Sequence, residues 1–287
     1  MTVETQSRDH AQSSPASTLA LRLDHVSVRL GDRLALNDVG FDVEAGSFVG
    51  LIGPNGSGKS TLLRAVLGVL PLAAGRIEVE GRPPEDSREA FAYLPQRQRL
   101  ELDLPLRAWD VAMMGRLRHT GWLRPARKQD KDAVAWALGR VGMLERRNSA
   151  VGELSFGQQQ RVLFARTLAQ EGRILLLDEP MNGVDPKTQE LFLELLAGFH
   201  AEGRTILMAT HDLNQAAEVC DYVCVLNQRL VAYGPLRRTL TEDVLRDAYG
   251  VHLHFMGDGP EGAHVLEDVH HHETSLEHFE GHRDRLD

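Results

Sequence analysis

The chain has 287 residues, of which 42% are hydrophobic and 25% are charged, close to the usage of ordinary globular proteins. This composition excludes wholesale disorder and a fibrous repeat, and the length allows one large α/β domain with a smaller appendage. The 41 acidic and 32 basic residues give a formal charge of −9, which argues against a general attraction to nucleic-acid backbones, so we expect no nucleic-acid partner.

The N-terminal segment 1–19 is rich in Ser, Thr, Gln and Asp and has little to bury, so we expect it to be disordered. It lacks the basic start and apolar stretch of a secretory signal, which predicts that the chain stays in the cytosol. No apolar run in the sequence reaches the roughly 18 to 20 residues that span a bilayer. Any membrane association is therefore expected to go through a partner.

The first third of the chain is dominated by strand patterns. Apolar and polar residues alternate over 21–30 and 34–46, on either side of a Gly-Asp turn, which predicts antiparallel strands with one buried face. The denser apolar run 47–53 predicts a strand at the buried centre of a sheet. A glycine-rich loop follows, and helical spacing begins in 60–70. Further short strands are expected at 75–81 and 88–96.

A helical pattern from about Leu106 to Gly152 predicts an inserted helical subdomain. Strands and helices then alternate, which predicts a largely parallel sheet covered on both faces. An acidic, histidine-rich tail follows Gly250. The expected helices of the second half are 158–170, 186–203 and 212–220, and the expected strands are 173–180, 205–210, 221–227 and a return strand at 229–234.

Residues 53–60, GPNGSGKS, match the phosphate-binding loop G-x-x-x-x-G-K-[ST] between a strand and a helix. Its glycines let backbone N–H groups surround a β-phosphate, the following helix directs its positive end at that group, and Lys59 reaches the β and γ oxygens. A mere turn would leave Lys59 and the Ser60-Thr61 pair unexplained. The candidate phosphate-binding residues are Gly53, Pro54, Asn55, Gly56, Ser57, Gly58, Lys59, Ser60 and Thr61.

Two acids, Asp178 and Glu179, follow the aliphatic strand 174–177. Ligands of open parallel sheets bind at the carboxyl ends of the strands, so we expect both acids to emerge beside the phosphate loop. Successive strand residues point in opposite directions, so the two carboxylates need not do the same work. Asp178 suits a magnesium shell, and Glu179 suits orienting and deprotonating an attacking water.

The segment LSFGQ at 154–158 resembles the signature motif of ATP-binding cassette (ABC) proteins, usually Leu-Ser-Gly-Gly-Gln. The order of motifs over residues 20–240 also agrees with that family: phosphate loop, Gln96, signature, acidic pair, Asp185 in NGVD, and His211. The resemblance implies an α/β fold, the P-loop NTPase-like ABC nucleotide-binding domain. Such a domain has a mostly parallel sheet core with an antiparallel β subdomain and a helical subdomain. We expect the ATPase domain at 20–250, its helical subdomain at about 100–165, and a disordered His-rich tail at 251–287.

The resemblance also implies an ATP-hydrolysing site with ATP and Mg²⁺ as its ligands. It assigns phosphate contacts to Lys59 and Thr61, the catalytic base to Glu179, and a γ-phosphate contact to His211. It assigns Mg²⁺ and its waters to Ser60, Gln96 and Asp178.

In such proteins the signature closes over the ATP that the opposite subunit holds. The resemblance therefore implies that two copies of the chain sandwich two nucleotides head to tail, with Asp185 in the loop that crosses the interface. The residues implied on the partner's ATP are Ser155, Gly157 and Gln158.

Two positions depart from the family pattern. Phe156 replaces the first glycine of the signature, which adds bulk near the partner's phosphate, but we do not expect inactivity. Leu30 stands where the family stacks an aromatic ring on adenine, so stacking is lost unless Phe41 or another ring substitutes. Simple packing would also explain an apolar residue at Leu30.

With one cassette and no spanning helix, the chain resembles a separate ATPase subunit bound to membrane permease subunits. Such a subunit lies peripherally at the cytoplasmic face of the plasma (inner) membrane. Phrases such as DEPMNGVDPKTQE and LNQRLVAYGP resemble the manganese and zinc importers, which receive metal from an external binding lipoprotein. Iron-chelate and cobalamin importers share much of this wording, and an exporter would use the same catalytic motifs. The different-class alternative is a cytosolic metal-responsive regulatory protein on a cassette scaffold.

Three further groups have open interpretations. Cys220 and Cys224 suit buried strand thiols better than a metal or redox pair, because no second pair accompanies them. A basic stretch from Arg116 to Lys131 could face the membrane side or a partner, or could form a solvated helical face. Eight of the thirteen histidines follow residue 250, where they could bind or sense metal or could be incidental. They are His252, His254, His264, His270, His271, His272, His278 and His282.

Overall fold

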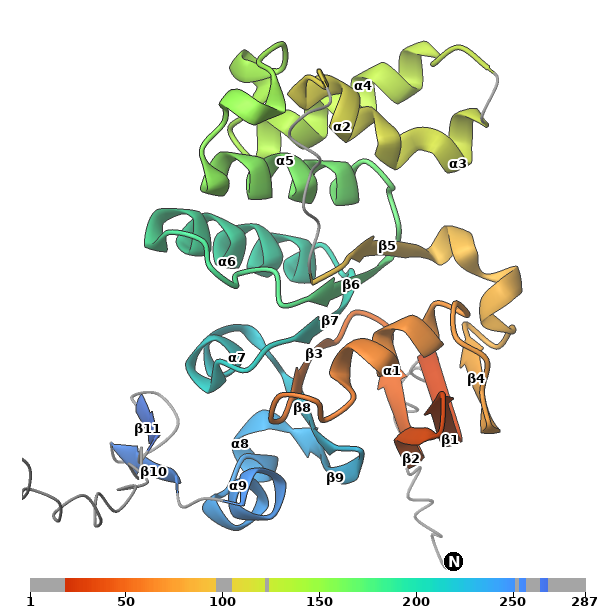
Figure 1. Cartoon of the computed structure of the whole chain (residues 1–287), viewed down its shortest axis with the longest axis vertical. Coiled ribbons are helices and arrows are strands. Elements are labelled where there is room, and N and C mark those ends of the chain that lie inside the picture. Colours follow the sequence, from red (N-terminus) through yellow and green to blue (C-terminus); the bar gives the residue numbers. More distant parts are fainter. Residues whose placement is uncertain (1–18, 97–104, 122–123, 251–252, 257–263, 268–287) are drawn as a thin grey trace, which may run out of the picture.

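The computed structural model describes residues 19–96, 105–121, 124–250, 253–256 and 264–267. The expected disordered N-terminal segment lies outside these residues except for Leu19, which begins the first strand. Two layers of sheet and a separate group of helices are visible in Figure 1.

An antiparallel sheet forms where alternation predicted it. The strands β1 (Leu19–Leu30) and β2 (Arg33–Glu44) pair around the turn at Gly31. The strand β4 (Ala74–Val79) pairs with the other edge of β1, so the order is β2-β1-β4. The buried residues of β1 alternate with exposed ones, as in a sheet with one face in the core.

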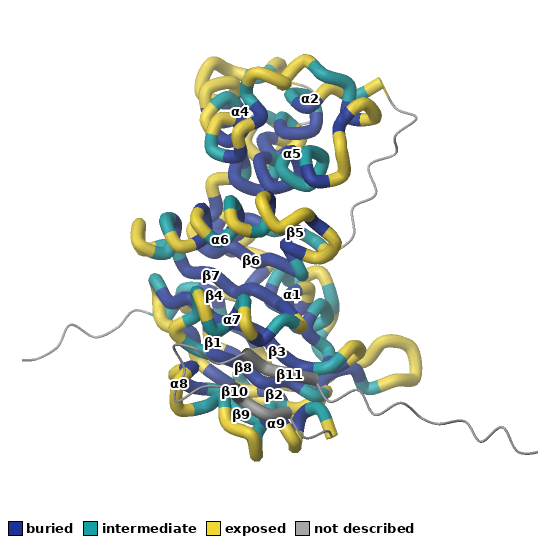
Figure 2. Tube along the Cα trace, turned by 90° about the vertical axis from the view of Figure 1, so that its left-hand side faces the viewer, coloured by how far each residue is buried: buried dark blue, intermediate teal, exposed yellow. Residues whose placement is uncertain are grey.

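The main sheet has six strands in the order β5-β6-β7-β3-β8-β9. Neighbouring strands run parallel except β9, which returns antiparallel to β8, so the predicted parallel sheet and return strand are confirmed. All residues of β3, β6 and β7 are buried, because both faces of the sheet are covered (Figure 2). The strands are β3 (Phe48–Ile52), β5 (Phe91–Leu94), β6 (Ile174–Asp178), β7 (Thr205–Ala209), β8 (Tyr222–Asn227) and β9 (Arg229–Pro235).

Alternate residues of β6 belong to two different cores. Ile174 and Leu176 pack with the antiparallel sheet and the helix α1 (Lys59–Val66). Leu175 and Leu177 pack on the other side with the helix α6 (Pro186–Ala201). Helices α1 and α6 therefore cover opposite faces, as Figure 1 shows. The remaining helices of this part are α7 (Leu213–Val219), α8 (Leu236–Thr239) and α9 (Glu242–Tyr249).

The predicted helical subdomain is a group of helices beside α6, at the top of Figure 1. Helix α5, expected from residue 158, begins two residues earlier at Phe156. The helices are α2 (Ala108–Met113), α3 (Leu117–Thr120), α4 (Lys128–Arg140) and α5 (Phe156–Leu168). Single 3₁₀ turns lie at Pro84–Asp86, Arg88–Ala90, Met114–Arg116, Leu144–Arg146 and Val151–Glu153.

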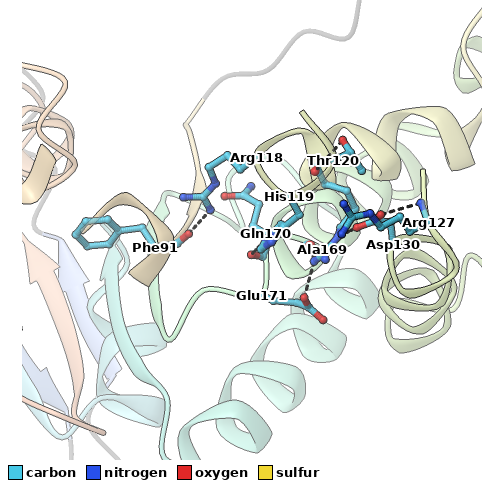
Figure 3. A network of polar contacts seen from close by, with 10 residues as sticks. Phe91, Arg118, His119, Thr120, Arg127, Asp130, Ala169, Gln170 and Glu171 are labelled. Carbon is cyan, nitrogen blue, oxygen red and sulfur yellow. Dashed lines mark hydrogen bonds and ion pairs between the residues drawn. The ribbon is translucent and has the colours of Figure 1, made fainter. Parts of the chain in front are cut away.

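A polar network joins this subdomain to the sheet core (Figure 3). The Arg116 guanidinium is buried, with Nε 3.1 Å from a carboxylate oxygen of Asp130, and it also pairs with Glu171. Arg118 donates to the backbone carbonyl of Phe91 at the start of β5. The interpretation of the basic stretch as one exposed face is therefore wrong at Arg116, because a buried carboxylate neutralises it. The exposed members of the stretch are Arg118, Arg124, Arg127, Lys128 and Lys131.

Both cysteines are free thiols. Cys224 is buried in β8 as predicted, but Cys220 caps the end of α7 and is not in a strand. Burial raises the pKa of both thiols, which disfavours the reactive thiolate. Within the described residues, no three His, Cys, Asp or Glu side chains gather as a metal site, and no helix has the length and apolarity to cross a bilayer.

The tail expected to be disordered contains two short strands. The strands β10 (Leu253–Met256) and β11 (His264–Glu267) pair antiparallel. They differ from the expectation because each contains apolar residues that favour strands, Leu253, Phe255 and Met256 in β10 and Val265 and Leu266 in β11. The other candidate metal-binding histidines of the tail lie outside the described residues.

Candidate functional site

The phosphate loop lies between β3 and α1 and is packed too closely to carry side chains at its glycines. A Cβ on Gly53 would lie 2.0 Å from the carbonyl oxygen of Leu226. A Cβ on Gly58 would lie 2.5 Å from a methyl carbon of Leu36 in β2, and the φ of Gly58 is +104°. The glycines are therefore required by packing and by backbone conformation, and both sheets hold the loop in place.

Lys59 turns back over this loop. Its Nζ donates to the carbonyl oxygens of Gly53 at 2.7 Å and Pro54 at 3.1 Å. Burial lowers the pKa of Lys59, while the charges of Glu179 and Asp178 act in the opposite direction. The loop carbonyls thus supply hydrogen-bond acceptors, and the nearby carboxylates supply the negative charge that a buried ammonium needs.

Ser60 and Asp178 meet at the end of β6. The Ser60 hydroxyl donates to Asp178 Oδ1 at 2.9 Å, and the Asp178 side chain is fully buried. Its other oxygen, Oδ2, has no hydrogen-bond partner among the described residues. Burial raises the pKa of Asp178, and the nearby Glu179 charge adds to this, against the Ser60 hydrogen bond. A buried carboxylate oxygen left unpaired beside a hydroxyl is a donor set that fits Mg²⁺.

Glu179 turns away from the strand direction, since its φ of +51° is in the left-handed region. Its Oε2 accepts a hydrogen bond from Asn182 Nδ2 at 2.8 Å. His211 Nδ1 lies 3.8 Å from its Oε1, and the Glu179 side chain is only 7% exposed. The predicted base and the predicted γ-phosphate contact are thus neighbours, because they follow the ends of the adjacent strands β6 and β7.

A cavity of about 320 Å³ joins the phosphate loop to the acidic strand end. Such a volume lies within the range of small-ligand sites. Gln96 and Glu179 line it, which brings the predicted γ-phosphate end into one space with the loop. A smaller cavity of about 150 Å³ lies on the other side of Glu179 and includes His211 and Asn182. The first cavity is lined by Leu30, Arg33, Ala35, Asn55, Gly56, Ser57, Gly58, Lys59, Ser60, Thr61, Gln96 and Glu179.

The signature residues lie apart from this cavity, at the N-terminus of α5. Ser155 Oγ accepts a hydrogen bond from the backbone N–H of Gln158, and Gln158 Oε1 accepts one from the backbone N–H of Ser155. The two side chains therefore cap the helix reciprocally. A Cβ on Gly157 would lie 2.3 Å from Asp185 Oδ2. Asp185 in turn caps α6 through Thr188. None of the signature residues lines either cavity.

Phe156 and Leu30, the two departures from the family pattern, lie in different surroundings. The Phe156 side chain points outward, with 53% of the residue exposed. Leu30 lines the nucleotide-sized cavity and is 45% exposed. Phe41 does not substitute as a stacking ring, because its ring packs against Tyr233 in the core with centroids 4.7 Å apart.

Sequence reasoning missed Arg33, Ala35 and Asn182. Arg33 and Ala35 belong to β2 and reach the loop through the packing of one sheet on the other. Asn182 lies three residues after Glu179, a spacing at which a side-chain amide can contact a preceding carboxylate. That spacing is a signal the sequence contained.

The family model of the ABC transporter matches residues 36–182. The manganese transport ATP-binding protein MntB of Bacillus subtilis is 38% identical, with 83% of this chain and 95% of that protein covered. The zinc transport ATP-binding protein TroB of Treponema pallidum is 39% identical, with coverage of 82% and 88%. Among solved structures, a metal-chelate type ABC transporter in an inward-facing conformation matches with a TM-score of 0.76 and 25% identity, covering 87% of this chain and 97% of that one.

These matches span both the cavity with its phosphate loop and the signature helix. They agree with a geometry in which Lys59 and Glu179 line one cavity. The chain therefore belongs to the ABC transporter family and is an ATP-binding ATPase subunit of that family.

Proposed function

We propose that this ATPase subunit powers the import of a divalent metal ion, manganese or zinc, through partner membrane permease subunits. The observation that carries the proposal is its similarity to the ATP-binding proteins of a manganese and a zinc transport system. Each similarity extends over more than four fifths of the chain. The cargo itself is selected elsewhere, since the residues around the cavity face a nucleotide.

We assign the nucleotide chemistry to the residues around the cavity. Lys59 and Thr61 hold the phosphates of ATP, and helix α1 directs its positive end at them. Mg²⁺, when bound, neutralises phosphate charge. Glu179 orients and deprotonates the attacking water, and His211 contacts the γ-phosphate. The three residues we assign to Mg²⁺ and its waters are Ser60, Gln96 and Asp178, supported by the unpaired Asp178 oxygen.

A second copy of the chain completes the site. Ser155, Gly157 and Gln158 bind the ATP held by the partner copy, and Asp185 lies beside them at the same interface. The support is that these residues lie outside the cavity of their own chain while Ser155 and Phe156 are exposed. ATP then adds contacts that exist only in the closed dimer, and hydrolysis removes them, which shifts the population of closed and open states.

We place the assembly at the cytoplasmic face of the plasma membrane, with the ATPase bound peripherally to its permease. An extracytoplasmic metal-binding protein delivers the ion on the far side. The manganese and zinc relatives support this arrangement because they are named as ATP-binding proteins of transport systems.

Deletion and complementation test the transport role. Cells lacking this chain are expected to accumulate less manganese or zinc, measured as total cell metal. Wild type and the exposed control Glu190→Gln are expected to restore uptake, and Glu179→Gln is not. Unchanged levels of both metals after deletion would reject the proposed cargo. Uptake restored fully by Glu179→Gln would instead favour the regulatory alternative.

An iron chelate is the second candidate cargo, favoured by the structural match to a metal-chelate type transporter. The same cells measured for iron accumulation distinguish the two. Loss of iron with normal manganese and zinc would select the chelate.

The dimer is tested with a variant that keeps the helix cap. Ser155→Asp retains an oxygen that can cap α5 but places a negative charge where the partner's phosphates are expected. In a Glu179→Gln background with ATP, the parent is expected to sediment as a dimer and the Ser155→Asp variant as a monomer. Equal dimerisation of both would contradict the head-to-tail arrangement.

A further inference from the structure

The phosphate loop gives the nucleotide cavity a direction. At one side, Ser60 bonds Asp178 and the cavity reaches Glu179. At the other side, Arg33 Nη2 donates to the Gly56 carbonyl at 3.4 Å, and Leu30 lines the same space. Since the reacting γ-phosphate belongs at the acidic side, the ribose and base of the nucleotide extend toward Leu30 and Arg33.

The base side of this cavity offers no aromatic ring. Its lining residues within the described part of the chain contain no Phe, Tyr, Trp or His. The Phe41 and Tyr233 rings pack against each other, with centroids 4.7 Å apart, and neither lines the cavity. The flat group that remains at this side is the guanidinium of Arg33.

The position of Arg33 is set by the fold. The loop packs directly on β2, because Gly58 lies against Leu36 and the Ala35 carbonyl, both near the start of the strand that Arg33 begins. The Arg33 residue is exposed, and its hydrogen bond to the Gly56 carbonyl is long, at 3.4 Å. A guanidinium so placed keeps N–H groups and a flat face available to a ligand.

We propose that Arg33 is the base-binding residue of this ATPase, its guanidinium plane stacking on the purine while Leu30 supplies apolar contact. Planar guanidinium groups stack on aromatic faces more effectively than an ammonium does. This inference rests on the proposed function, because the direction of the nucleotide depends on the roles assigned to Ser60, Asp178 and Glu179.

Binding to the full-length chain, measured by calorimetry, tests the stacking. Arg33→Ala is expected to weaken ATP binding by roughly 3- to 30-fold, the range of cation–π contacts. The same variant is expected to bind magnesium tripolyphosphate, which has no base, as wild type does within about twofold. Equal weakening for both ligands would overturn stacking, because the arginine would then act by charge on phosphate.

Two further variants separate plane from charge. Arg33→Lys keeps the charge and loses the plane, so we expect it to bind ATP more weakly than wild type does. Leu30→Tyr added to Arg33→Ala supplies a ring and is expected to recover most of the ATP affinity. A lysine variant with wild-type affinity, or no recovery by the tyrosine, would contradict the proposal. Arg29→Ala is the matched control, since Arg29 lies on the same hairpin outside the cavity lining.

Lys59→Ala distinguishes this inference from the proposed function. It is expected to lose binding of both ATP and tripolyphosphate. If wild type binds no nucleotide, or Lys59→Ala binds normally, the proposed phosphate site itself fails. If Lys59→Ala behaves as expected and Arg33→Ala binds ATP as wild type does, only the role of Arg33 fails.

Discussion

The phosphate loop and the signature motif both begin a helix, but they are built in opposite ways. The loop is enclosed: Lys59 is 6% exposed and Ser60 bonds the fully buried Asp178. The signature is open: Ser155 caps its own helix, and Phe156 beside it is 53% exposed. One region meets its chemical partners within the chain, while the other lies at the surface, with Ser155 and Phe156 exposed. The difference supports a site completed by a second copy.

The helical subdomain is built differently from the main sheet. Apolar packing on both faces holds the main sheet. The subdomain shares an apolar cluster with one face of that sheet, buries the pair of Arg116 and Asp130 within itself, and contacts β5 through Arg118 and the Phe91 carbonyl (Figure 3). Single substitutions can change each region separately. Their effects on ATPase kinetics and on the free energy of unfolding test the role that the structure indicates for each region.

The largest expected effect is on chemistry in the enclosed region. Glu179→Gln removes the proposed base and is expected to lower kcat for ATP by roughly 10²- to 10⁴-fold, the usual contribution of general base catalysis. ATP affinity is expected to stay near wild type, because Lys59 and the loop are unchanged. Steady-state ATPase kinetics with Glu190→Gln as the control check this. A loss of less than tenfold would remove Glu179 from the role of base.

The next effect is on the helical subdomain, where Arg116 and Asp130 form a buried pair. Asp130→Ala leaves the buried Arg116 guanidinium without that carboxylate, which is expected to lower the free energy of unfolding by about 3 to 5 kcal/mol. Urea unfolding measures it. Asp132→Ala, on the exposed face of the same helix, is the control and should change stability by less than about 0.5 kcal/mol. Equal midpoints for the two variants would contradict a structural role for the pair.

The pH dependence of that loss has a definite sign. Burial acts to raise the pKa of Asp130, but the Arg127 backbone and the Arg116 guanidinium outweigh it, so the pKa lies below its ordinary value. A lowered pKa means that the carboxylate stabilises the fold above its unfolded pKa and loses this effect as pH falls through the folded pKa. The difference between wild type and Asp130→Ala is therefore expected to be full at pH 7 and to shrink below about pH 4. A difference in the free energy of unfolding that grows on acidification would contradict the lowered pKa of Asp130.

A smaller effect is expected where the signature touches the rest of its own chain. Gly157→Ala places a methyl 2.3 Å from Asp185 Oδ2, so Asp185 must move or the helix must shift. The expected loss of stability is about 1 to 3 kcal/mol. Gly139→Ala in α4 is the matched control, since its Cβ meets nothing within 4 Å, and it is expected to stabilise by about 0.5 to 1 kcal/mol. Thermal unfolding of both variants measures these changes. Stabilisation by Gly157→Ala would contradict the close approach of Asp185 to position 157.

The smallest effect belongs to the exposed phenylalanine. Phe156→Gly restores the usual signature glycine and removes a side chain with little packing in its own chain. Stability is expected to change by less than about 0.5 kcal/mol, within the range of surface substitutions. ATPase activity is expected to stay within about threefold of wild type. A large loss would show that this ring is part of the active dimer.

Short-range patterns predicted much of the fold. Alternation placed β1 and β2, and the glycine-rich run placed the loop before α1, because these signals depend on neighbouring residues. The pattern was wrong at Arg116, which pairs with Asp130 and Glu171 on other segments. It was also wrong at Cys220, which lies between the end of α7 at Val219 and the start of β8 at Tyr222. The ion pairs of Arg116 join segments that are distant in the sequence, and the periodicity of the sequence does not encode them.

By itself, the sequence determined the α/β class, the phosphate loop, the acidic strand end and the resemblance to ABC ATPases. These depend on residue order and spacing, which a motif preserves. Only the tertiary structure decided that Asp178 keeps an unpaired buried oxygen, that Glu179 lies between two cavities, and that Arg33 and Leu30 close one of them. The physical reason is that the cavity forms where two sheets pack together, so its walls come from residues that are neighbours only after folding.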